Sequence, residues 1–193
     1  MFIVIEGIDG SGKTTVSRLL ASYLRRRNYS VFLTFEPTDG PIGKVIRNYL
    51  SSAKERDLVY EALLFAADRR WHVVNVISPA LKKYDFVISD RYVYSSYAYQ
   101  QSEDTPLDWL VEINRGIIVP NVAVFLDVMP EECIRRLKNK SASLTLLENI
   151  DTLRRTYENY MYIVERFNMI KVNANKPPNN VLSDILKILN IKG

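Results

Sequence analysis

The sequence predicts an α/β fold in which a parallel sheet is covered by helices on both faces, as a three-layer α/β/α sandwich. Two observations carry this prediction. Short apolar runs alternate with longer segments of helical periodicity, and a glycine-rich loop separates the first run from the first helix. The chain has 193 residues, of which 47% are hydrophobic and 25% are charged. We therefore expect residues 1–193 to form a single domain with a sizeable core.

The glycine-rich loop fits the pattern G-x-x-x-x-G-K-[ST] of a phosphate-binding loop. A buried strand from Phe2 to Glu6 precedes it, and a helix from about Val16 to Arg27 follows it. Glycines let successive backbone N–H groups point inward and cradle phosphate oxygens, and the helix dipole points at the same anion. The residues expected to bind ATP are Gly7, Ile8, Asp9, Gly10, Ser11, Gly12, Lys13, Thr14 and Thr15.

Four side chains near this loop have expected chemical roles. Lys13 is expected to reach the terminal phosphates, and the Thr14 hydroxyl is expected to ligate Mg²⁺. Asp90 ends an apolar run, where a second acid would hold the same Mg²⁺ directly or through water. Arg91 places a guanidinium fork where phosphate charge must be balanced. The alternative for the last two residues is a structural Asp–Arg ion pair.

The remaining elements follow in order along the chain. Strands are expected at residues 31–35, 86–90, 122–127 and 169–172, and helices at 42–50, 57–82, after Pro106, and at 130–137, 148–167 and 181–191. Pro79 marks the last turn of the 57–82 helix or a break in it. Ligands of parallel sheets bind at the carboxyl ends of the strands. The phosphate-binding loop, Glu36, Asp90 and the loop after Val172 are therefore expected at one edge.

Composition argues against several other classes of protein. No apolar run approaches the ~20 residues of a membrane span, and the N-terminus leads directly into a strand, so neither a span nor a cleavable signal peptide is expected. Cys133 is the single cysteine, which suits a reducing cytoplasm and an inert helix position. The net charge of +4 suits a pocket for polyanionic nucleotides. The basic residues are dispersed, so a surface for nucleic acid is not expected.

Two groups of side chains could recognise a nucleoside. Phe65 and Arg69 lie four residues apart on one helix face, where the ring can stack on a base and the guanidinium can bond its edge. The structural alternative is a core phenylalanine beside a surface arginine. Four tyrosines follow Arg91 and either line a nucleoside pocket or pack between helices, namely Tyr92, Tyr94, Tyr97 and Tyr99.

A basic segment precedes a run of small polar residues near position 140. Its cations are Arg135, Arg136, Lys138 and Lys140. Such a segment suits a lid that closes cations over a transferring phosphate, and we expect that lid at about residues 136–147. A solvated helix end explains the same residues about as well.

These segments together resemble the thymidylate kinase family. The phosphate-binding loop, Glu36-Pro37, Leu64 to Arg69 and Asp90-Arg91-Tyr92 stand in that family's order, and the resemblance covers about residues 1–175. It implies a P-loop kinase fold with a five-stranded parallel sheet and a homodimer built from helices. It also implies that Mg·ATP phosphorylates dTMP to dTDP in dTTP biosynthesis.

The resemblance further implies roles for individual residues. Phe65 would stack on thymine, Arg69 would bond its O4 edge, and Tyr99 would crowd the sugar C2′ and disfavour ribose. Asp9 and Asp90 would lie near the acceptor phosphate and the metal. The implied dTMP-binding residues are Glu36, Pro37, Phe65, Arg69, Arg91, Ser96 and Tyr99. The implied catalytic residues are Lys13, Arg91, Asp9, Arg135 and Arg136, and the implied metal ligands are Thr14 and Asp90.

The sequence departs from the family in two places. Phe35 stands where many members have arginine, and the small polar loop lacks the arginine that members with an uncharged phosphate-binding loop place there. Either Arg135 or Arg136 supplies that charge, or Lys138 or Lys140 partly substitutes for it.

Three other functions stay open on the sequence alone. The first is a deoxynucleoside kinase, which needs a carboxylate base near the acceptor hydroxyl, and Glu36 is the candidate for it. The second is a kinase for a different nucleoside monophosphate. The third is a regulatory protein that binds nucleotide without turning it over, which the altered lid would favour.

Overall fold

The computed structural model describes residues 1–139 and 149–190. Its middle layer is an all-parallel sheet of five strands in the order β2-β3-β1-β4-β5. The strands are β1 (Phe2–Glu6), β2 (Val31–Phe35), β3 (Phe86–Asp90), β4 (Val122–Asp127) and β5 (Ile170–Asn173). All five predicted strands are confirmed, the last one shifted by one residue.

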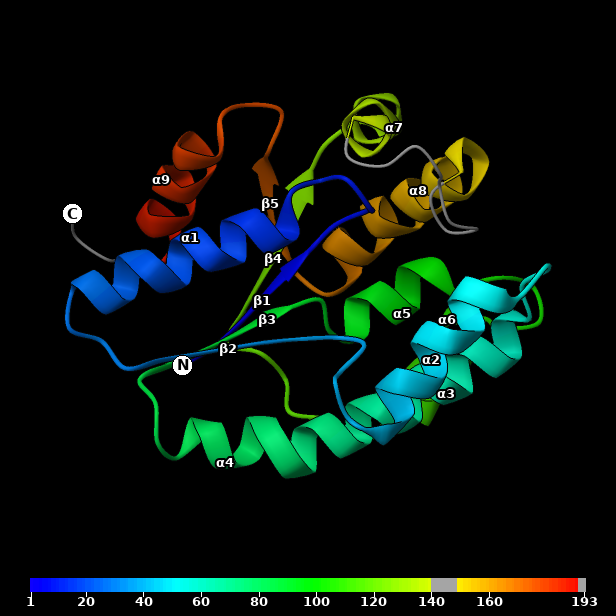
Figure 1. Cartoon of the computed structure of the whole chain (residues 1–193). Helices are drawn as coiled ribbons and strands as arrows, with labels where there is room; N and C mark the ends of the chain where they lie inside the picture. Colours follow the sequence, from blue (N-terminus) through cyan, green and yellow to red (C-terminus); the bar gives the residue numbers. More distant parts are fainter. Residues whose placement is uncertain (140–148, 191–193) are drawn as a thin grey trace.

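Helices cover both faces of this sheet, which confirms the three-layer α/β/α fold. On one face lie α1 (Lys13–Arg26) and α9 (Pro178–Ile188), and on the other lie α4 (Ser78–Leu81) and α5 (Val93–Tyr99) (Figure 1). The helix α8 (Ile150–Arg166) packs against α5. The other helices are α2 (Pro41–Ser52), α3 (Leu58–His72), the π-helical turn η1 (Val73–Ile77), α6 (Leu107–Ile113) and α7 (Pro130–Lys138).

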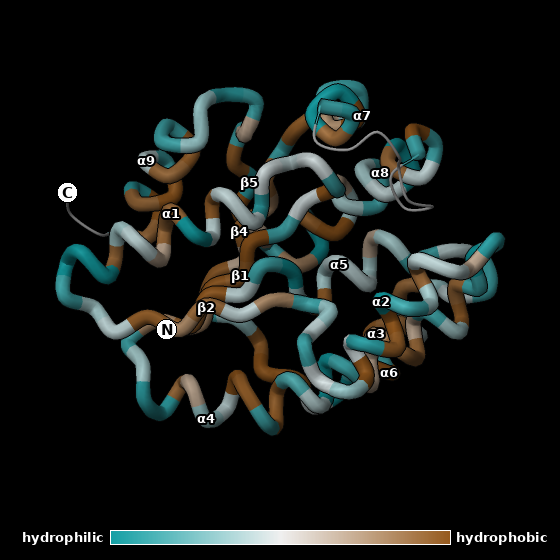
Figure 2. The backbone as a smooth tube through the Cα atoms, viewed as in Figure 1, coloured by the Kyte–Doolittle hydropathy of each residue, from teal (hydrophilic) through white to brown (hydrophobic). Residues whose placement is uncertain are grey.

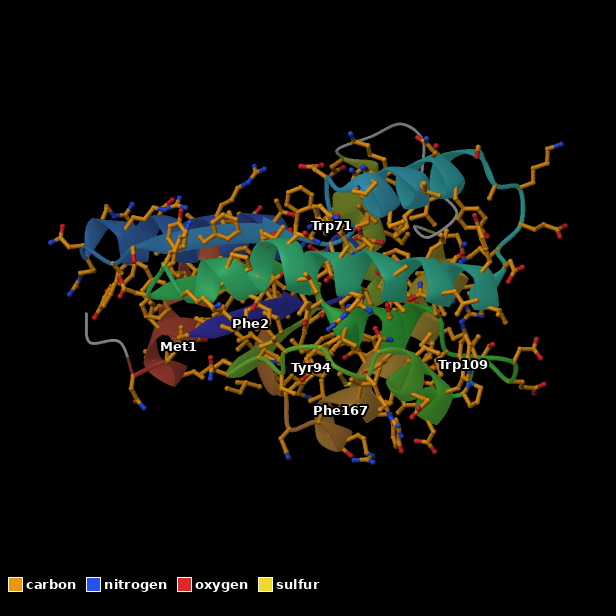
Figure 3. The ribbon with its side chains drawn as sticks, turned by 90° about the horizontal axis from the view of Figure 1, so that it is seen from below. Met1, Phe2, Trp71, Tyr94, Trp109 and Phe167 are labelled. Atoms are coloured by element: carbon orange, nitrogen blue, oxygen red, sulfur yellow. The ribbon has the colours of Figure 1, made fainter. Side chains whose placement is uncertain are left out.

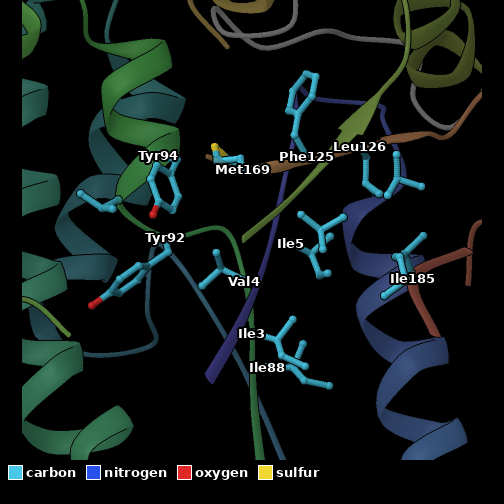
Figure 4. Packing of buried hydrophobic residues seen from close by; sticks show 14 of the residues in the cluster. Ile3, Val4, Ile5, Ile88, Tyr92, Tyr94, Phe125, Leu126, Met169 and Ile185 are labelled. Carbon is cyan, nitrogen blue, oxygen red and sulfur yellow. The ribbon is translucent and has the colours of Figure 1, made fainter. Parts of the chain in front are cut away.

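The sheet is apolar because it is buried on both faces, as parallel sheets require. Every residue of β1 is buried, and the hydrophobic strands form the brown centre of the tube in Figure 2. Figure 4 shows Ile3, Ile5 and Leu126 packing between the sheet and the helices α1 and α9. On the opposite side the ring of Phe125 lies 4.8 Å from that of Tyr160.

The strand register brings the ends of β1, β2 and β3 to one edge of the sheet. Asp90 of β3 is paired with Ile5 of β1 and with Phe35 of β2. The three strands therefore end side by side, and the residues that follow them lie at the carboxyl edge, where parallel sheets bind ligands. Those residues begin the phosphate-binding loop, the Glu36-Pro37 turn and the Arg91 turn, as the sequence predicts.

The structure refines two predicted segments. The helix expected at 57–82 is observed as α3, η1 and α4, which follow one another without a gap from Leu58 to Leu81, and Pro79 lies in α4 directly after the π-helical turn. Residues 92–101, whose four tyrosines were expected either to line a nucleoside pocket or to pack between helices, contain α5. Lys140 and residues 140–147 of the predicted lid lie outside the described residues, as do the predicted helix ends at 148 and 191.

The helices show no candidate for a membrane span. Within residues 1–139 and 149–190, none is both long enough and apolar enough to cross a bilayer.

Gly43 in α2 offers a test of the packing that positions this edge. A Cβ atom at Gly43 would stand 1.9 Å from the carbonyl oxygen of Thr38, so Gly43→Ala forces α2 away from the turn after β2. We expect the free energy of unfolding in urea to fall by about 3 kcal/mol. The exposed neighbour Lys44 provides the control, because Lys44→Ala should change that free energy by less than about 0.5 kcal/mol. Equal values for the two variants would contradict this packing.

Candidate active site

Two cavities open at the carboxyl edge and share one wall. The first has a volume of about 510 Å³ and lies over the phosphate-binding loop. The second, of about 370 Å³, lies between α2, α3 and α5. Asp9, Phe35 and Arg91 line both of them. A ligand in one cavity would therefore meet a ligand in the other at these three residues.

The phosphate-binding loop has the backbone that its glycines predict. Gly10 and Gly12 have φ values of 85° and 99°, which side chains with a Cβ rarely adopt. A Cβ on Gly10 would also stand 2.6 Å from the carbonyl oxygen of Cys133 in α7. Gly12 is the N-cap of α1, so the free N–H groups and the positive dipole end of that helix face the first cavity.

Lys13 lies at the base of the first cavity and is almost completely buried. Its Nζ donates to the carbonyl oxygen of Ile8 at 2.8 Å and lies 3.9 Å from an Asp9 carboxylate oxygen. Burial, followed by the nearby charge of Arg91, lowers the pKa of Lys13 to about 8. A phosphate bound in this loop would raise the pKa of Lys13 again, because it brings a negative charge close to the buried ammonium.

Thr14 and Asp90 form an oxygen pair in the same cavity. The Thr14 hydroxyl donates to Asp90 Oδ2 at 2.5 Å, and both residues line the cavity. Mg²⁺ prefers hard oxygen ligands and is usually held by one or two protein oxygens plus phosphates and water. This pair fits such an ion. Among the described residues no group of three or more His, Cys, Asp or Glu side chains could hold a metal ion by itself.

Arg91 stands at the shared wall and makes an ion pair with Asp9. Burial alone would raise the pKa of Asp9, but the charges of Arg91 and Lys13 lower it below its ordinary value. Tyr99 completes the cluster, because its hydroxyl accepts from the Asp9 N–H at 2.8 Å and donates to the Asp9 carboxylate at 3.1 Å. Arg91 therefore forms an ion pair with Asp9, whereas its chain neighbour Asp90 accepts a hydrogen bond from Thr14. Asp90 and Arg91 thus each have a partner other than one another.

The turn that carries Arg91 is held by Glu6, a residue that sequence reasoning missed. Arg91 has a φ of 71°, an unusual backbone conformation for a residue other than glycine. Glu6 at the end of β1 accepts from the Tyr92 N–H at 2.8 Å and from the Ser95 hydroxyl at 2.6 Å. Ser95 in turn accepts from Arg91 Nη1 at 3.0 Å. Burial raises the pKa of Glu6. The sequence did contain a signal for this role, because Glu6 is an acidic residue at the end of an otherwise apolar strand.

The second cavity contains the side chains expected around a nucleoside. Its lining includes the predicted residues Pro37, Phe65, Arg91, Ser96 and Tyr99. It also includes Arg47, Leu50 and Gln100, which sequence reasoning did not identify. Gln100 Oε1 is buried and has no hydrogen-bond partner among the described residues. An unpaired buried acceptor in a cavity wall is suited to a ligand N–H.

Arg69 is fully buried, so the interpretation as a surface arginine is wrong. Its guanidinium donates to Glu36 at 2.9 Å, to Asn114 at 2.7 Å and to the Ser96 hydroxyl at 3.0 Å. Ser96 lines the second cavity, and Arg69 lies behind it. The other Glu36 oxygen is 3.0 Å from His72 Nδ1. Side-chain bonds that join β2, α3 and α5 cannot be inferred from helical spacing.

The four tyrosines after Arg91 divide between the two roles that were open. Tyr92, Tyr94 and Tyr97 are buried in the core, and Tyr99 lines the second cavity. Figure 3 shows Tyr94 close to Phe167, and their ring centroids are 5.6 Å apart. Packing therefore explains the first three residues.

Arg135 and Arg136, the arginines expected to supply the lid charge, lie in α7 and line a further cavity beside the phosphate-binding loop. A third cavity of about 460 Å³ is lined by Gly12, Arg135 and Arg136, among others. Glu132 accepts from Arg135 at 2.7 Å and from Arg136 at 2.8 Å. These hydrogen bonds lower the pKa of Glu132 to about 2. Arg136 also donates to the carbonyl oxygen of Ala174 at 3.3 Å, which joins α7 to the loop after β5.

A phosphate-binding loop and a second, nucleoside-sized cavity that meet at an arginine define a phosphotransferase of the P-loop class. Comparison with known proteins identifies the family within that class. The chain matches the thymidylate kinase family over residues 5–185, and it belongs to that family. The predicted resemblance is thereby confirmed, together with the enzyme class, an ATP-dependent phosphotransferase.

Individual relatives are similar along nearly their whole length. The probable thymidylate kinase of Thermococcus onnurineus is 39% identical over 98% of this chain and 97% of its own. The probable thymidylate kinase of Pyrococcus horikoshii is 41% identical over 97% of this chain and 95% of its own. The probable thymidylate kinase of Caldivirga maquilingensis is 40% identical over 100% of this chain and 94% of its own.

Lys13 links the site to the stability of the protein. Because its pKa is about 8 in the folded chain and ordinarily 10.5, its charge disfavours the nucleotide-free fold below pH 8, and that effect disappears as pH rises to 10.5. We expect Lys13→Met to increase the free energy of unfolding at pH 7 by up to about 3 kcal/mol and to lower turnover more than about 100-fold. Urea unfolding at pH 7 and pH 10.5 measures the first effect. Stabilisation that is the same at both pH values would contradict this interpretation, and Lys44→Met is the control.

Proposed function

We propose that this protein transfers the γ-phosphoryl group of Mg·ATP to dTMP, giving ADP and dTDP for dTTP biosynthesis. One observation supports this assignment above the others. The first and second cavities share Asp9 and Arg91, so a triphosphate over the loop and a monophosphate in the second cavity would meet beside one guanidinium. Alignment of two bound reactants can supply a large part of the rate enhancement in phosphoryl transfer.

The acceptor phosphate carries its own nucleophilic oxygen, so the site needs charge balance more than it needs a general base. Lys13 would bind the donor phosphates and Arg91 would bind the acceptor phosphate. Thr14 and Asp90 would hold Mg²⁺, which neutralises charge on the phosphates when it is bound. Arg135 or Arg136 would add a further cation from the lid at about residues 136–147, which would close within a single domain and exclude water.

The second cavity would recognise the nucleoside. Phe65 would stack on thymine and Ser96 would face its O4 edge, while Arg69, which donates to the Ser96 hydroxyl, would add positive charge behind that edge. Gln100 Oε1, which lacks a partner among the described residues, would accept the N3–H of the base. Tyr99 is fixed by its two hydrogen bonds to Asp9 and would crowd C2′ of a ribose.

A deoxynucleoside kinase is less well supported. That reaction would use Glu36 as a base, but one Glu36 oxygen accepts from Arg69 and the other lies against His72. A buried carboxylate with both oxygens engaged is poorly placed to accept a proton from a sugar hydroxyl. We also assign the enzyme to the cytoplasm, an assignment that the free, buried Cys133 supports.

We further propose a homodimer formed through the outer face of α3 and η1. Val59, Leu63 and Val74 are between 39% and 51% exposed there. Exposed apolar side chains gathered along one helix are typical of a surface that a second copy covers. This helical segment runs across the molecule in Figure 3, where Trp71 is labelled.

The dimer can be tested by light scattering after size exclusion. Leu63→Glu should convert the dimer to a monomer, because two copies cannot bury that charge without a partner for it. Val119→Glu changes a residue that is 75% exposed in the loop before β4, and it should leave the dimer intact. A monomer in the unchanged protein would disprove the proposal.

The substrate assignment is tested by ADP release with Mg·ATP and a panel of acceptors. The panel contains dTMP, dUMP, TMP with ribose, dCMP, dGMP, dAMP and thymidine. We expect the highest kcat/KM with dTMP, a lower value with dUMP, and a value at least about 100-fold lower with the ribose form. Phosphorylation of thymidine alone would indicate the deoxynucleoside kinase. Binding of ATP with no ADP release across the panel would indicate a regulatory protein.

A further inference from the structure

Gln100 lines the nucleoside cavity, and a buried carboxylate holds one side of its amide. Gln100 Nε2 donates to Glu61 Oε2 at 3.3 Å, whereas Oε1 has no partner among the described residues. A carboxylate accepts hydrogen bonds and an amide oxygen cannot donate one. Glu61 must therefore face the nitrogen side of the amide, which leaves Oε1 as the amide atom without a partner among the described residues.

Arg56 keeps Glu61 in this acceptor role. Arg56 Nε donates to Glu61 Oε1 at 2.9 Å, and Arg56 Nη2 donates to Glu61 Oε2 at 2.5 Å. The Glu61 side chain is completely buried. Arg56 Nη2 also donates to the carbonyl oxygen of Tyr99 at 3.2 Å, directly before Gln100 in the chain. A guanidinium fork of this kind fixes both the charge and the direction of the carboxylate.

The same helix contributes to both parts of base recognition. Glu61 and Phe65 are separated by one turn of α3, so the carboxylate that holds Gln100 and the ring that lines the cavity lie on one face of that helix. Residues of α3 therefore act on the face of the base through Phe65 and on its edge through Glu61 and Gln100.

We propose that Glu61, held by Arg56, is a positioning residue that presents the Gln100 amide oxygen to the base. This inference rests on the function proposed above and explains how the site chooses among pyrimidines. Thymine and uracil carry an N3–H donor, whereas N3 of cytosine is an acceptor. Two acceptors that face each other in a buried site leave both groups unpaired, so cytosine is rejected.

Glu61→Gln tests the proposal with almost no change of shape. A glutamine at position 61 can donate as well as accept, so the Gln100 amide is free to turn its nitrogen toward the base. We expect the ratio of kcat/KM for dTMP to that for dCMP to fall at least about tenfold, mainly through a higher KM for dTMP. The KM for ATP should stay within about twofold. Glu55→Gln is the matched control, because Glu55 is exposed just before α3.

A double-mutant cycle separates positioning from a merely structural effect. Gln100→Leu removes the amide, so adding Glu61→Gln to it should change the substrate ratio no further. Independent, additive effects of the two substitutions would overturn the proposal. A Glu61→Gln protein that keeps the dTMP preference of the unchanged protein would overturn this inference alone. No dTMP preference in the unchanged protein would overturn the proposed function with it.

One measurement needs no variant. A dTMP analogue that is methylated at N3 lacks the donor that the Gln100 oxygen would bind. We expect this analogue to bind the unchanged protein at least about tenfold more weakly than dTMP in a calorimetric titration. Equal binding of the two nucleotides would overturn the proposal.

Discussion

The arrangement of the site depends on the buried Arg91 side chain. It pairs with Asp9 of the phosphate-binding loop, donates to Ser95 of α5 and lies 5.1 Å from the ring centre of Tyr99. Burying a guanidinium is unfavourable unless carboxylates and acceptors surround it, as they do here. The loop after β1, the turn after β3 and the helix α5 are thus held together by one cation, at the point where the two cavities meet.

Three buried acids each accept hydrogen bonds from donors in or beside α3 and α5. Glu6 holds the first turn of α5 and the Ser95 hydroxyl. Glu36 holds Arg69 behind Ser96, and Glu61 holds the amide of Gln100. A carboxylate can only accept hydrogen bonds, so each acid fixes which atom of its neighbour faces it. The polarity of the second cavity is therefore set by residues that lie behind its wall.

The phosphate-binding loop is organised for a charge that the nucleotide supplies. Burial and Arg91 lower the pKa of Lys13, so its ammonium is less favourable in the free site than in water. A bound triphosphate would reverse that balance and stabilise the fold by mass action. Sites that store such unfavourable charge are commonly less stable than they could be, because the same groups must favour the ligand.

The sequence by itself determined the sheet, the phosphate-binding loop and the family. Alternating apolar runs and helical periods predicted all five strands, and glycine spacing predicted the loop, because both patterns are local. Tertiary structure alone decided that Arg69 is buried behind Ser96, and that Tyr92, Tyr94 and Tyr97 pack in the core. Glu61 and Gln100 are 39 residues apart, and their contact depends on how α3 packs near α5. Local spacing cannot report a hydrogen bond between two helices, since packing, and not periodicity, sets its direction.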